Sequence, residues 1–481
     1  MAGHSVEKIG GTSISDTEAV LQNVLIGPRE GEALYRRIFV VSAYAGMTDR
    51  LLDHKKTGEP GVYALFAAAS AGEGGRAWRA ALDQAAAAAR AINAERFEDD
   101  EDRAAADFFI ERRICRARSC LADLQRLCAH GHFRLDGQLG AVREMLASIG
   151  EAHSAHNLAL QLRRRGVNAR MVDLTGWDEQ AALSLDETIS AAFEDIDLAR
   201  ELPIVTGYAK SHPGLIAEYG RGYTEVVFSR IAALTGAREA IIHKEFHLSS
   251  ADPKLVGADA VRKIGRTNYD VADQLANLGM EAIHPRAAAG LRHAGIPLCV
   301  RNTFEPSDKG TTIWSDFVSE TPRVEIIAGA TGVTALELFE QDMVGVKGYD
   351  AGALAVLTRH TVRILSKASN ANTITHYLDA NPKQIKRVIA DLELQFPNAT
   401  VATRPVALVC VIGSDLNVPG LTAEAARALT EAGVEILGMQ QLTRRVDLQF
   451  VVDEQDYQAA VRALHARLVA PADGGSLKTA A

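Results

Sequence analysis

Short apolar runs alternate with longer stretches of helical periodicity through the first two-thirds of the chain. Each apolar run ends in small or polar residues, which is typical of strands whose C-terminal loops carry a ligand site. The alternation predicts an α/β domain with a mainly parallel sheet. The clearest predicted strands are residues 37–43, 169–174, 202–208, 239–244 and 296–302.

Between these strands, residues 63–127 form a long Ala- and Arg-rich region that predicts helices. Within it lies the acidic run ERFEDDEDR (residues 95–103), which predicts a solvated surface. The charge run therefore adds no candidate chemistry.

The pattern changes near Pro322. Beyond it, two segments share one rhythm of strand, helix, two strands and helix, so we expect two βαββα-type units in tandem. Each unit is too small to bury much apolar surface alone, so the two should pack on each other or on a second subunit. The predicted domains are residues 1–320, 321–402 and 403–470, followed by a disordered tail at 471–481.

Composition narrows the function classes. The chain has 481 residues and a net charge of −9, which gives no electrostatic case for nucleic acid or an anionic membrane as partner. No apolar run is long enough to span a bilayer, and the N-terminus lacks a basic-then-apolar signal pattern. The five scattered cysteines indicate reduced thiols, so we expect a cytoplasmic protein.

The opening stretch VEKIGGTSIS carries the first candidate site. Gly10 and Gly11 leave the backbone bare, so an anion can approach the main-chain N–H groups. Lys8 can bring a point charge to the same anion, and Thr12 and Ser13 can cap a following helix. This combination suits a phosphate. An ordinary strand-to-helix turn explains the same residues and stays open.

Two further residues suit the charged groups of an amino acid. Arg221 lies between two glycines and can hold a carboxylate bidentately, and Glu151 can accept from an ammonium group. A substrate with a second carboxylate, phosphorylated by ATP, would use both residues and the glycine loop. The alternatives are a surface ion pair for Arg221, an exposed helix position for Glu151 and a helix-dipole partner for Glu225.

Several motifs in this chain resemble those of one family. KIGGTS resembles the KFGGTS opening of aspartokinases, SAYAGMTD their SAxGGxT loop, IGEAHSA their GExLSA and YGRGYTEVVFS their GRGGSDxTA. SSADPKLV, GMEAIHP and PLCVRNTFEPSDKGTTI are similar to their YTxDPRxV, GAKVLHP and PxxVxNTFxPxxxGTxI, all in family order. IGGTS, TGWD and FHLSSADPKLVG most resemble the aspartokinases of ectoine biosynthesis.

The resemblance implies an amino-acid-kinase-type three-layer domain over residues 1–320, followed by tandem ACT-like units. It implies phosphorylation of the L-aspartate β-carboxylate by ATP, with Mg²⁺ held mainly by the nucleotide phosphates. It also implies a homodimer or higher homo-oligomer through the ACT-like units.

The resemblance also implies a role for each residue that matches a family motif. Lys8 and Glu225 are implied as catalytic, and Ser42, Thr48, Glu151 and Arg221 as substrate-binding. Glu151 would bind the ammonium group and Arg221 the α-carboxylate. The implied nucleotide-binding residues are Gly10, Gly11, Thr12, His243, Lys244, Asp252 and Lys254.

The chain departs from the family pattern at a few positions. Tyr223 stands where the motif has its second glycine, and Thr224–Glu225 replaces Ser-Asp. Lys244 and Glu281 stand where the family has Asp and Lys, so we expect these two side chains to face each other across the nucleotide site. Two alternatives follow from the departures: a catalytically weak kinase-like amino-acid sensor, or a kinase acting on another acidic amino acid.

Overall fold

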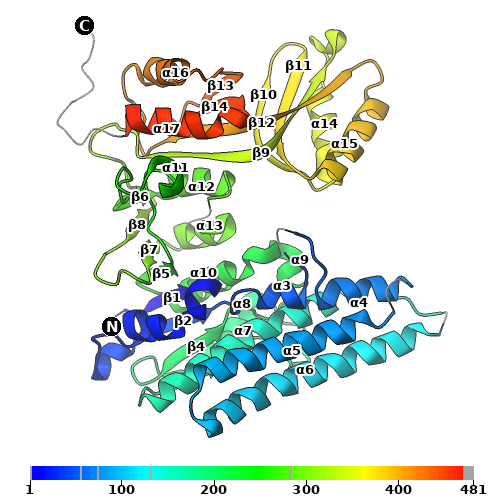
Figure 1. The fold of residues 1–481 in the computed structure, drawn as a ribbon, viewed down its shortest axis with the longest axis vertical. Helices are drawn as coiled ribbons and strands as arrows, with labels where there is room; N and C mark the ends of the chain where they lie inside the picture. The colour runs from blue at the N-terminus through cyan, green and yellow to red at the C-terminus, as the bar shows by residue number, and fades with distance from the viewer. Residues whose placement is uncertain (1–2, 55–56, 73–74, 131, 281–282, 470–481) are drawn as a thin grey trace. The chain divides into compact units, whose positions relative to one another are not determined.

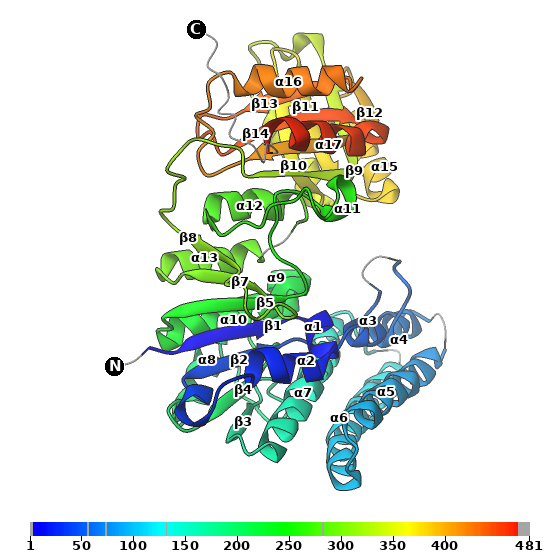
Figure 2. The ribbon, with the colours of Figure 1, turned by 60° about the vertical axis from the view of Figure 1, so that its left-hand side comes forward.

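The computed structural model describes residues 3–54, 57–72, 75–130, 132–280 and 283–469, without the side chain of Arg221. The predicted tail and Glu281 lie outside these residues. Packing divides the chain into two units (Figures 1 and 2). The first comprises Met1–His247 and Ile283–Ser315, and the second Leu248–Ala282 and Asp316–Ala481.

The first unit is built on a sheet in the strand order β3-β4-β2-β1-β5-β7-β8. The strands pair in parallel except for β8, which is antiparallel to β7, and Lys8 lies between Val40 and Ile242 in register. This confirms the predicted mainly parallel sheet. The strands are β1 (Ser5–Ile9), β2 (Arg37–Val41), β3 (Ala169–Val172), β4 (Leu202–Thr206), β5 (Glu239–Lys244), β7 (Leu298–Asn302) and β8 (Thr311–Trp314).

Helices cover both faces of this sheet, which gives the expected three layers. Successive side chains of a strand point to opposite faces, so Ile9 and Lys8 face different layers. Ile9, Phe39 and Ile204 pack with apolar residues of α7, whereas Lys8 meets α10. The helices and single turns are α1 (Gly11–Ser15), α2 (Thr17–Val20), η1 (Leu21–Leu25), η2 (Gly31–Leu34), α3 (Met47–Leu51), α4 (Val62–Ser70), α5 (Ala77–Arg96), α6 (Asp100–Cys128), α7 (Leu139–Arg164), α8 (Leu185–Phe193), α9 (Leu215–Tyr219), η3 (Gly220–Gly222), α10 (Tyr223–Thr235) and α13 (Pro285–His293).

The long helices α5 and α6 lie side by side in the first unit (Figure 2). Their connection carries the acidic run, which is mostly exposed as predicted. Two of its members are structural, however. The Asp99 carboxylate accepts from the N–H groups of Glu101 and Asp102 and caps α6, and Asp102 is buried against Arg164.

The second unit contains one antiparallel sheet in the order β10-β11-β9-β12-β14-β13. The long strands β9 and β12 are antiparallel, with Phe339 opposite Thr400 at one end and Ile326 opposite Ile412 at the other. This pairing joins the two ACT-like units within one sheet. This confirms the tandem arrangement. The elements are α11 (Pro253–Val256), β6 (Arg266–Asn268), α12 (Tyr269–Asn277), β9 (Ile326–Phe339), η4 (Gln341–Met343), α14 (Tyr349–Arg359), β10 (Arg363–Ser369), β11 (Thr373–Asp379), α15 (Pro382–Gln395), β12 (Thr400–Ile412), α16 (Leu421–Glu431), β13 (Gly438–Gln441), β14 (Asp447–Asp453), η5 (Glu454–Asp456) and α17 (Tyr457–Leu468).

The segment at residues 248–282 packs with the second unit. Ser250 explains part of this, because its hydroxyl lies 2.9 Å from Nε2 of His465 and its carbonyl accepts from the N–H of Ile327. Leu255 and Val256 add apolar contacts to the same core. In the part of the chain that the structure describes, no helix is both long and apolar enough to cross a membrane.

Candidate active site

The C-terminal ends of β1, β2, β4 and β5 meet at one edge of the parallel sheet, where ligands bind in open α/β folds. Small residues bring the following loops close together. A Cβ on Gly11 would lie 2.7 Å from the carbonyl oxygen of Ala43, and one on Gly150 would lie 2.7 Å from the Ala43 Cβ. The glycine loop, the loop after β2 and helix α7 are therefore in direct contact.

Two lysines and one carboxylate lie on the same face of the sheet at this edge. Nζ of Lys8 is 3.4 Å from Oε1 of Glu225 at the start of α10. Lys244 ends β5 on the face that also carries Lys8, because Lys8 is in register with Ile242, two residues before Lys244. The positive charge of Lys244 also acts on Glu225. Lys8, Lys244 and Glu225 thus form one cluster of charged side chains at this edge.

Glu225 is held in its ionised form. Burial opposes ionisation, but the charges of Lys8 and Lys244 and a hydrogen bond from the main-chain N–H of His284 together hold the pKa of Glu225 below its ordinary value. His284 approaches closely because Gly222 has no side chain. A carboxylate with these partners orients Lys8 and does not act as a proton acceptor.

The glycine loop lies beside Lys8. A Cβ on Gly10 would lie 3.7 Å from Nζ of Lys8 and 3.8 Å from the carbonyl oxygen of His243, so a side chain there would occupy the space over the lysine. Thr12 is exposed, whereas Ser13 is buried and donates to Oε1 of Glu245 at 2.9 Å. The bare backbone beside an ammonium group suits the approach of a phosphate.

The side chain of His243 points to the opposite face of the sheet. Its Nε2 lies 2.8 Å from Oε2 of Glu7, and Arg37 pairs with the same carboxylate at 2.8 Å. Burial lowers the pKa of His243. Burial alone would raise the pKa of Glu7, but Arg37 and His243 together hold it well below its usual range. Only the main chain of His243 lies beside the glycine loop, so its predicted nucleotide role stays a prediction.

Glu151 occupies a buried position on α7 and has one unused oxygen. Its Oε1 accepts from the hydroxyl of Tyr223 at 2.6 Å, and none of the described residues donates a hydrogen bond to its buried Oε2. Burial raises the pKa of Glu151 to about 7. A buried acceptor without a partner is costly unless a ligand supplies the donor, and an ammonium group would do so.

The other predicted substrate residues lie around the loop after β2. The N–H of Ser42 donates to Ile9, and its carbonyl accepts from the hydroxyl of Ser154 on α7. Thr48 is half-buried on α3. Arg221 lies in the turn η3, and its side chain is outside the described part of the chain.

The remaining predicted nucleotide residues belong to the second unit. The carboxylate of Asp252 accepts from the N–H of Lys254 and caps α11, and the Lys254 side chain is exposed. Their roles stay predictions.

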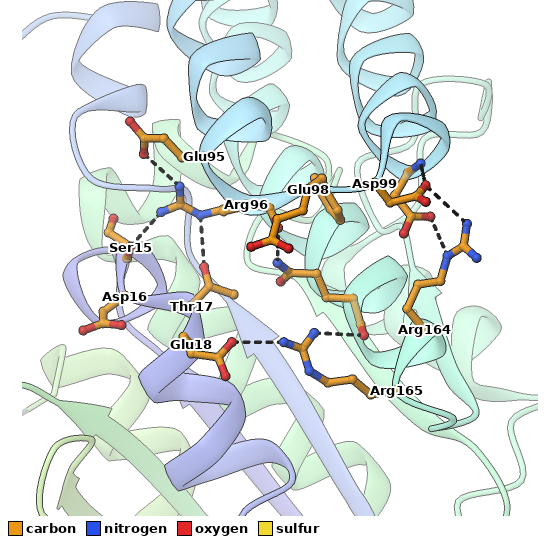
Figure 3. A pocket seen from close by; sticks show the side chains of 13 residues that line it. Ser15, Asp16, Thr17, Glu18, Glu95, Arg96, Glu98, Asp99, Arg164 and Arg165 are labelled. Carbon is orange, nitrogen blue, oxygen red and sulfur yellow. Dashed lines mark hydrogen bonds and ion pairs between the residues drawn. The ribbon is translucent and has the colours of Figure 1, made fainter.

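A polar groove of about 750 Å³ lies behind the glycine loop (Figure 3). Arg96 donates to the carbonyl of Ser15 and the hydroxyl of Thr17, and Arg165 pairs with Glu18 at 3.0 Å. With Arg164 bound to Asp102, each arginine of the groove already has acceptors from the chain. The groove therefore fixes the end of α1 and offers no ready phosphate site.

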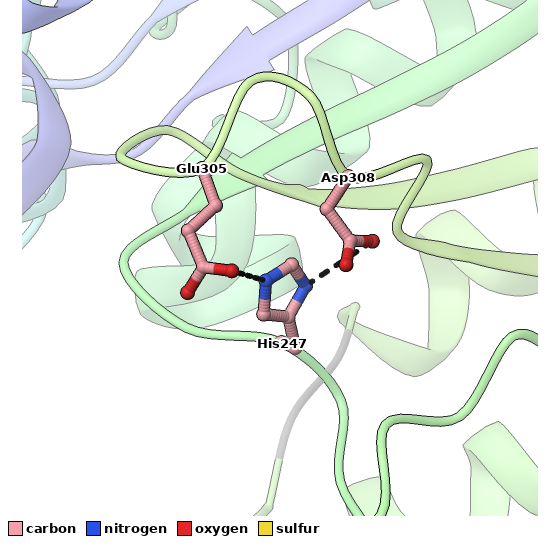
Figure 4. Close-up of side chains that lie close together, drawn as sticks. All are labelled: His247, Glu305 and Asp308. Atoms are coloured by element: carbon pink, nitrogen blue, oxygen red, sulfur yellow. Dashed lines mark ion pairs between the residues drawn. The ribbon is translucent and has the colours of Figure 1, made fainter.

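His247 lies between two carboxylates in the first unit (Figure 4). Its Nε2 is 3.0 Å from Glu305 and its Nδ1 is 3.8 Å from Asp308. A metal ion would bind one nitrogen of the ring, whereas these carboxylates lie at different nitrogens. The arrangement holds the ring in place and joins the loops that follow β5 and β7.

The structure adds partners that the sequence did not reveal. Sequence analysis paired Lys244 with Glu281, which lies outside the described residues, so that pairing stays a prediction; in addition, the charge of Lys244 acts on Glu225. Tyr223 was noted as a departure from a motif, but its contact with Glu151 was not foreseen. The one indication in the sequence was that Tyr223 replaces a motif glycine close to Arg221, a predicted substrate-binding residue.

Comparison with known proteins gives a consistent result. Residues 5–302 match the model of the amino acid kinase family, and residues 409–468 match an ACT domain model. The chain is 54% identical over 478 residues to aspartate kinase Ask_Ect of Stutzerimonas stutzeri, covering 99% of this chain and 100% of that one. It is 25% identical to an aspartokinase of Schizosaccharomyces pombe, over 68% of this chain and 69% of that one.

Solved structures show the same fold. The E. coli aspartokinase III complex with aspartate and ADP aligns with a TM-score of 0.71 and 21% identity, covering 97% of this chain and 99% of that one. The complex of that enzyme with lysine and aspartate gives a TM-score of 0.72 and 20% identity, covering 97% and 100%.

Proposed function

Because this chain belongs to the amino acid kinase family and is an aspartate kinase, we propose that the edge of its parallel sheet holds aspartate at Glu151 and nucleotide phosphates at Lys8 and Lys244. The observation that carries this assignment is the buried Oε2 of Glu151, which has no hydrogen-bond partner, at the sheet edge that also holds the cluster of Lys8, Glu225 and Lys244. The ammonium group of an amino acid can donate to Oε2 of Glu151. The phosphates of a nucleotide can bind the ammonium groups of Lys8 and Lys244.

The chemistry needs positioning and charge neutralisation more than a base. The β-carboxylate of aspartate is already ionised at neutral pH, so it can attack the terminal phosphorus directly as ADP leaves. Glu151 holds the ammonium group, and Arg221 is assigned to the α-carboxylate. Lys8, oriented by Glu225, neutralises charge that develops on the transferring phosphoryl group.

The described residues fit a magnesium nucleotide. Bound Mg²⁺ neutralises phosphate charge. Glu225 is the acidic side chain beside Lys8, and its oxygens already serve Lys8 and the N–H of His284. We therefore assign the metal mainly to the nucleotide phosphates, while the backbone at Gly10 and Gly11 approaches those phosphates.

The assignment predicts aspartate-dependent turnover. Purified protein with Mg-ATP should release ADP only when L-aspartate is present, and hydroxylamine should trap the acyl phosphate as a hydroxamate. L-Glutamate under the same conditions is the control substrate. Tight binding of an amino acid without turnover would favour the sensor alternative, which the 54% identity to an aspartate kinase does not favour.

We also propose a pathway and a cellular location for this enzyme. The motifs shared with ectoine-type aspartokinases support a role in ectoine biosynthesis, with a product that also serves the aspartate family of amino acids. The reduced cysteines support a cytoplasmic location.

We also infer a homodimer through the ACT-like units. Strands β10 and β13 end the sheet of the second unit, and Met439 on β13 is 52% exposed. Light scattering of the full chain should give twice its mass of 51.6 kDa. Met439→Lys should shift the equilibrium toward monomers, with exposed Leu394→Lys on α15 as the matched control. A monomeric wild type would contradict the dimer, and a dimer unaffected by Met439→Lys would place the interface elsewhere.

A further inference from the structure

Tyr223 connects the two helical layers of the first unit across the edge of the sheet. It is the first residue of α10, only 2% of its surface is exposed, and its hydroxyl donates to Oε1 of Glu151 on α7. The position carries glycine in the motif that this stretch resembles. A glycine there has no side chain that could reach Glu151.

A second tyrosine fixes the ring of Tyr223. The ring of Tyr208 packs edge-on against it, with centroids 5.8 Å apart and planes at 78°. The hydroxyl of Tyr208 donates to Glu144 at 2.8 Å. Glu144 and Glu151 are seven residues apart on α7 and so lie on one face of that helix.

Glu144 is itself immobilised. Its Oε1 accepts from the main-chain N–H groups of Ile216 and Ala217 in α9, the helix that leads into η3 and Tyr223. The two carboxylates of α7 thus each receive one phenol hydroxyl from the segment at residues 208–223. The Tyr223 hydroxyl has little freedom to leave Oε1.

Burial and hydrogen bonds together set the charge of Glu151. Burial is the largest influence, and it favours the neutral form. The described groups that bear on it are the hydroxyl of Tyr223 from α10, main-chain groups of Ala43 from the loop after β2, and main-chain groups of Glu151 itself. The charges of Glu144 and Glu151 both act on the hydroxyls of Tyr208 and Tyr223.

We propose that Tyr223 is a positioning residue for aspartate: its hydroxyl occupies one oxygen of Glu151, orients the carboxylate and leaves Oε2 directed at the substrate ammonium group. The inference rests on the proposed role of Glu151. Without the hydroxyl, Oε1 would lose its side-chain donor, and the carboxylate would be freer to rotate or to take up a proton. Substrate binding would then have to restore both orientation and charge.

Tyr223→Phe removes this one hydroxyl and keeps the ring. We expect the KM for aspartate at pH 7 to rise about ten-fold, because a hydrogen bond to a buried charged group is lost, while kcat and the KM for ATP change less than two-fold. Loss of the donor raises the pKa of Glu151 further above its value of about 7. The increase in KM should therefore shrink between pH 7 and pH 9, where the carboxylate ionises in both proteins.

Tyr208→Phe is the matched control, because it removes a neighbouring buried hydroxyl that serves Glu144. It should leave the pH dependence of the aspartate KM unchanged. Calorimetric titration with aspartate at pH 7 and pH 9 provides a second readout, and melting temperatures report whether each variant is folded.

Each outcome decides a separate point. If Tyr223→Phe leaves the aspartate KM unchanged at every pH while Glu151→Gln impairs aspartate use, the role of Tyr223 is overturned and the role of Glu151 stands. If Glu151→Gln also leaves aspartate use intact, the proposed site itself fails. An equal, pH-independent loss in both tyrosine variants would reduce Tyr223 to a packing residue and overturn the inference.

Discussion

Glu151→Gln is expected to lower kcat/KM for aspartate by about two orders of magnitude or more while stabilising the unliganded protein above pH 7. The first effect follows from removing the charged partner of an ammonium group in a buried site, which costs about 2–4 kcal/mol. Glutamine keeps an oxygen for the Tyr223 hydroxyl, so the hydrogen bond that fixes the side chain is retained. ATP affinity should change little.

The second effect follows from proton linkage. The pKa of Glu151 rises from 4.5 to about 7 on folding, so the folded state holds the proton more tightly than the unfolded state. Stability is therefore lost as pH rises from about 4.5 to about 7, by up to about 3 kcal/mol in total. Glutamine carries no such penalty, so the variant should melt above the wild type at pH 8 and close to it at pH 4.5.

Two measurements test this pair of effects. Steady-state kinetics with varied aspartate and with varied ATP separate the two substrates, and thermal melting without ligands at pH 4.5 and pH 8 isolates the linkage. Unchanged aspartate kinetics would remove Glu151 from the substrate pocket. A pH-independent difference in melting temperature would show that Glu151 does not carry the raised pKa.

Lys8→Met should lower kcat by about two to three orders of magnitude, because a preorganised charge at the transferring phosphoryl group contributes mainly in the transition state. In this variant, Glu225 would still interact with the positive charge of Lys244 and accept the hydrogen bond from the main-chain N–H of His284. The local fold should therefore survive, and calorimetric binding of aspartate should remain within a few-fold of wild type.

Lys244→Met is the matched comparison, because it removes the second cation that acts on Glu225. We expect it to raise the KM for ATP several-fold and to affect kcat much less than Lys8→Met does. Equal effects in the two variants would mean that neither lysine is specific to the reaction step. Retention of kcat within three-fold in Lys8→Met would contradict its catalytic role.

Much of the fold was predictable from the apolar pattern, since each strand expected at residues 37–43, 169–174, 202–208, 239–244 and 296–302 contains an observed strand. The rhythm after Pro322 also predicted two repeated units, which the resemblance to aspartokinases identified as ACT-like. Their union through β9 and β12 was not predictable, because antiparallel register between strands about 70 residues apart leaves no local pattern.

The candidate site shows the same limit. His243 and Lys244 were both predicted at the nucleotide site, but they are neighbours in β5 and their side chains point to opposite faces of the sheet. Tyr223 and Glu151 lie 72 residues apart on different helices. No local pattern relates the two residues, and only the complete fold brings the start of α10 to α7 at the edge of the sheet.

The pairing of β9 with β12 has a consequence for the nascent chain during its synthesis. β11 covers one edge of β9 at Thr334–Phe339, and β12, which begins at Thr400, pairs along the other edge from Phe339 to Ile326. Until the ribosome has made β12, the chain presents a strand of 14 residues with that second edge open along its length. Such an edge can pair with another nascent chain, so the interval before β12 emerges is when polysome-bound copies are most prone to cross-pair.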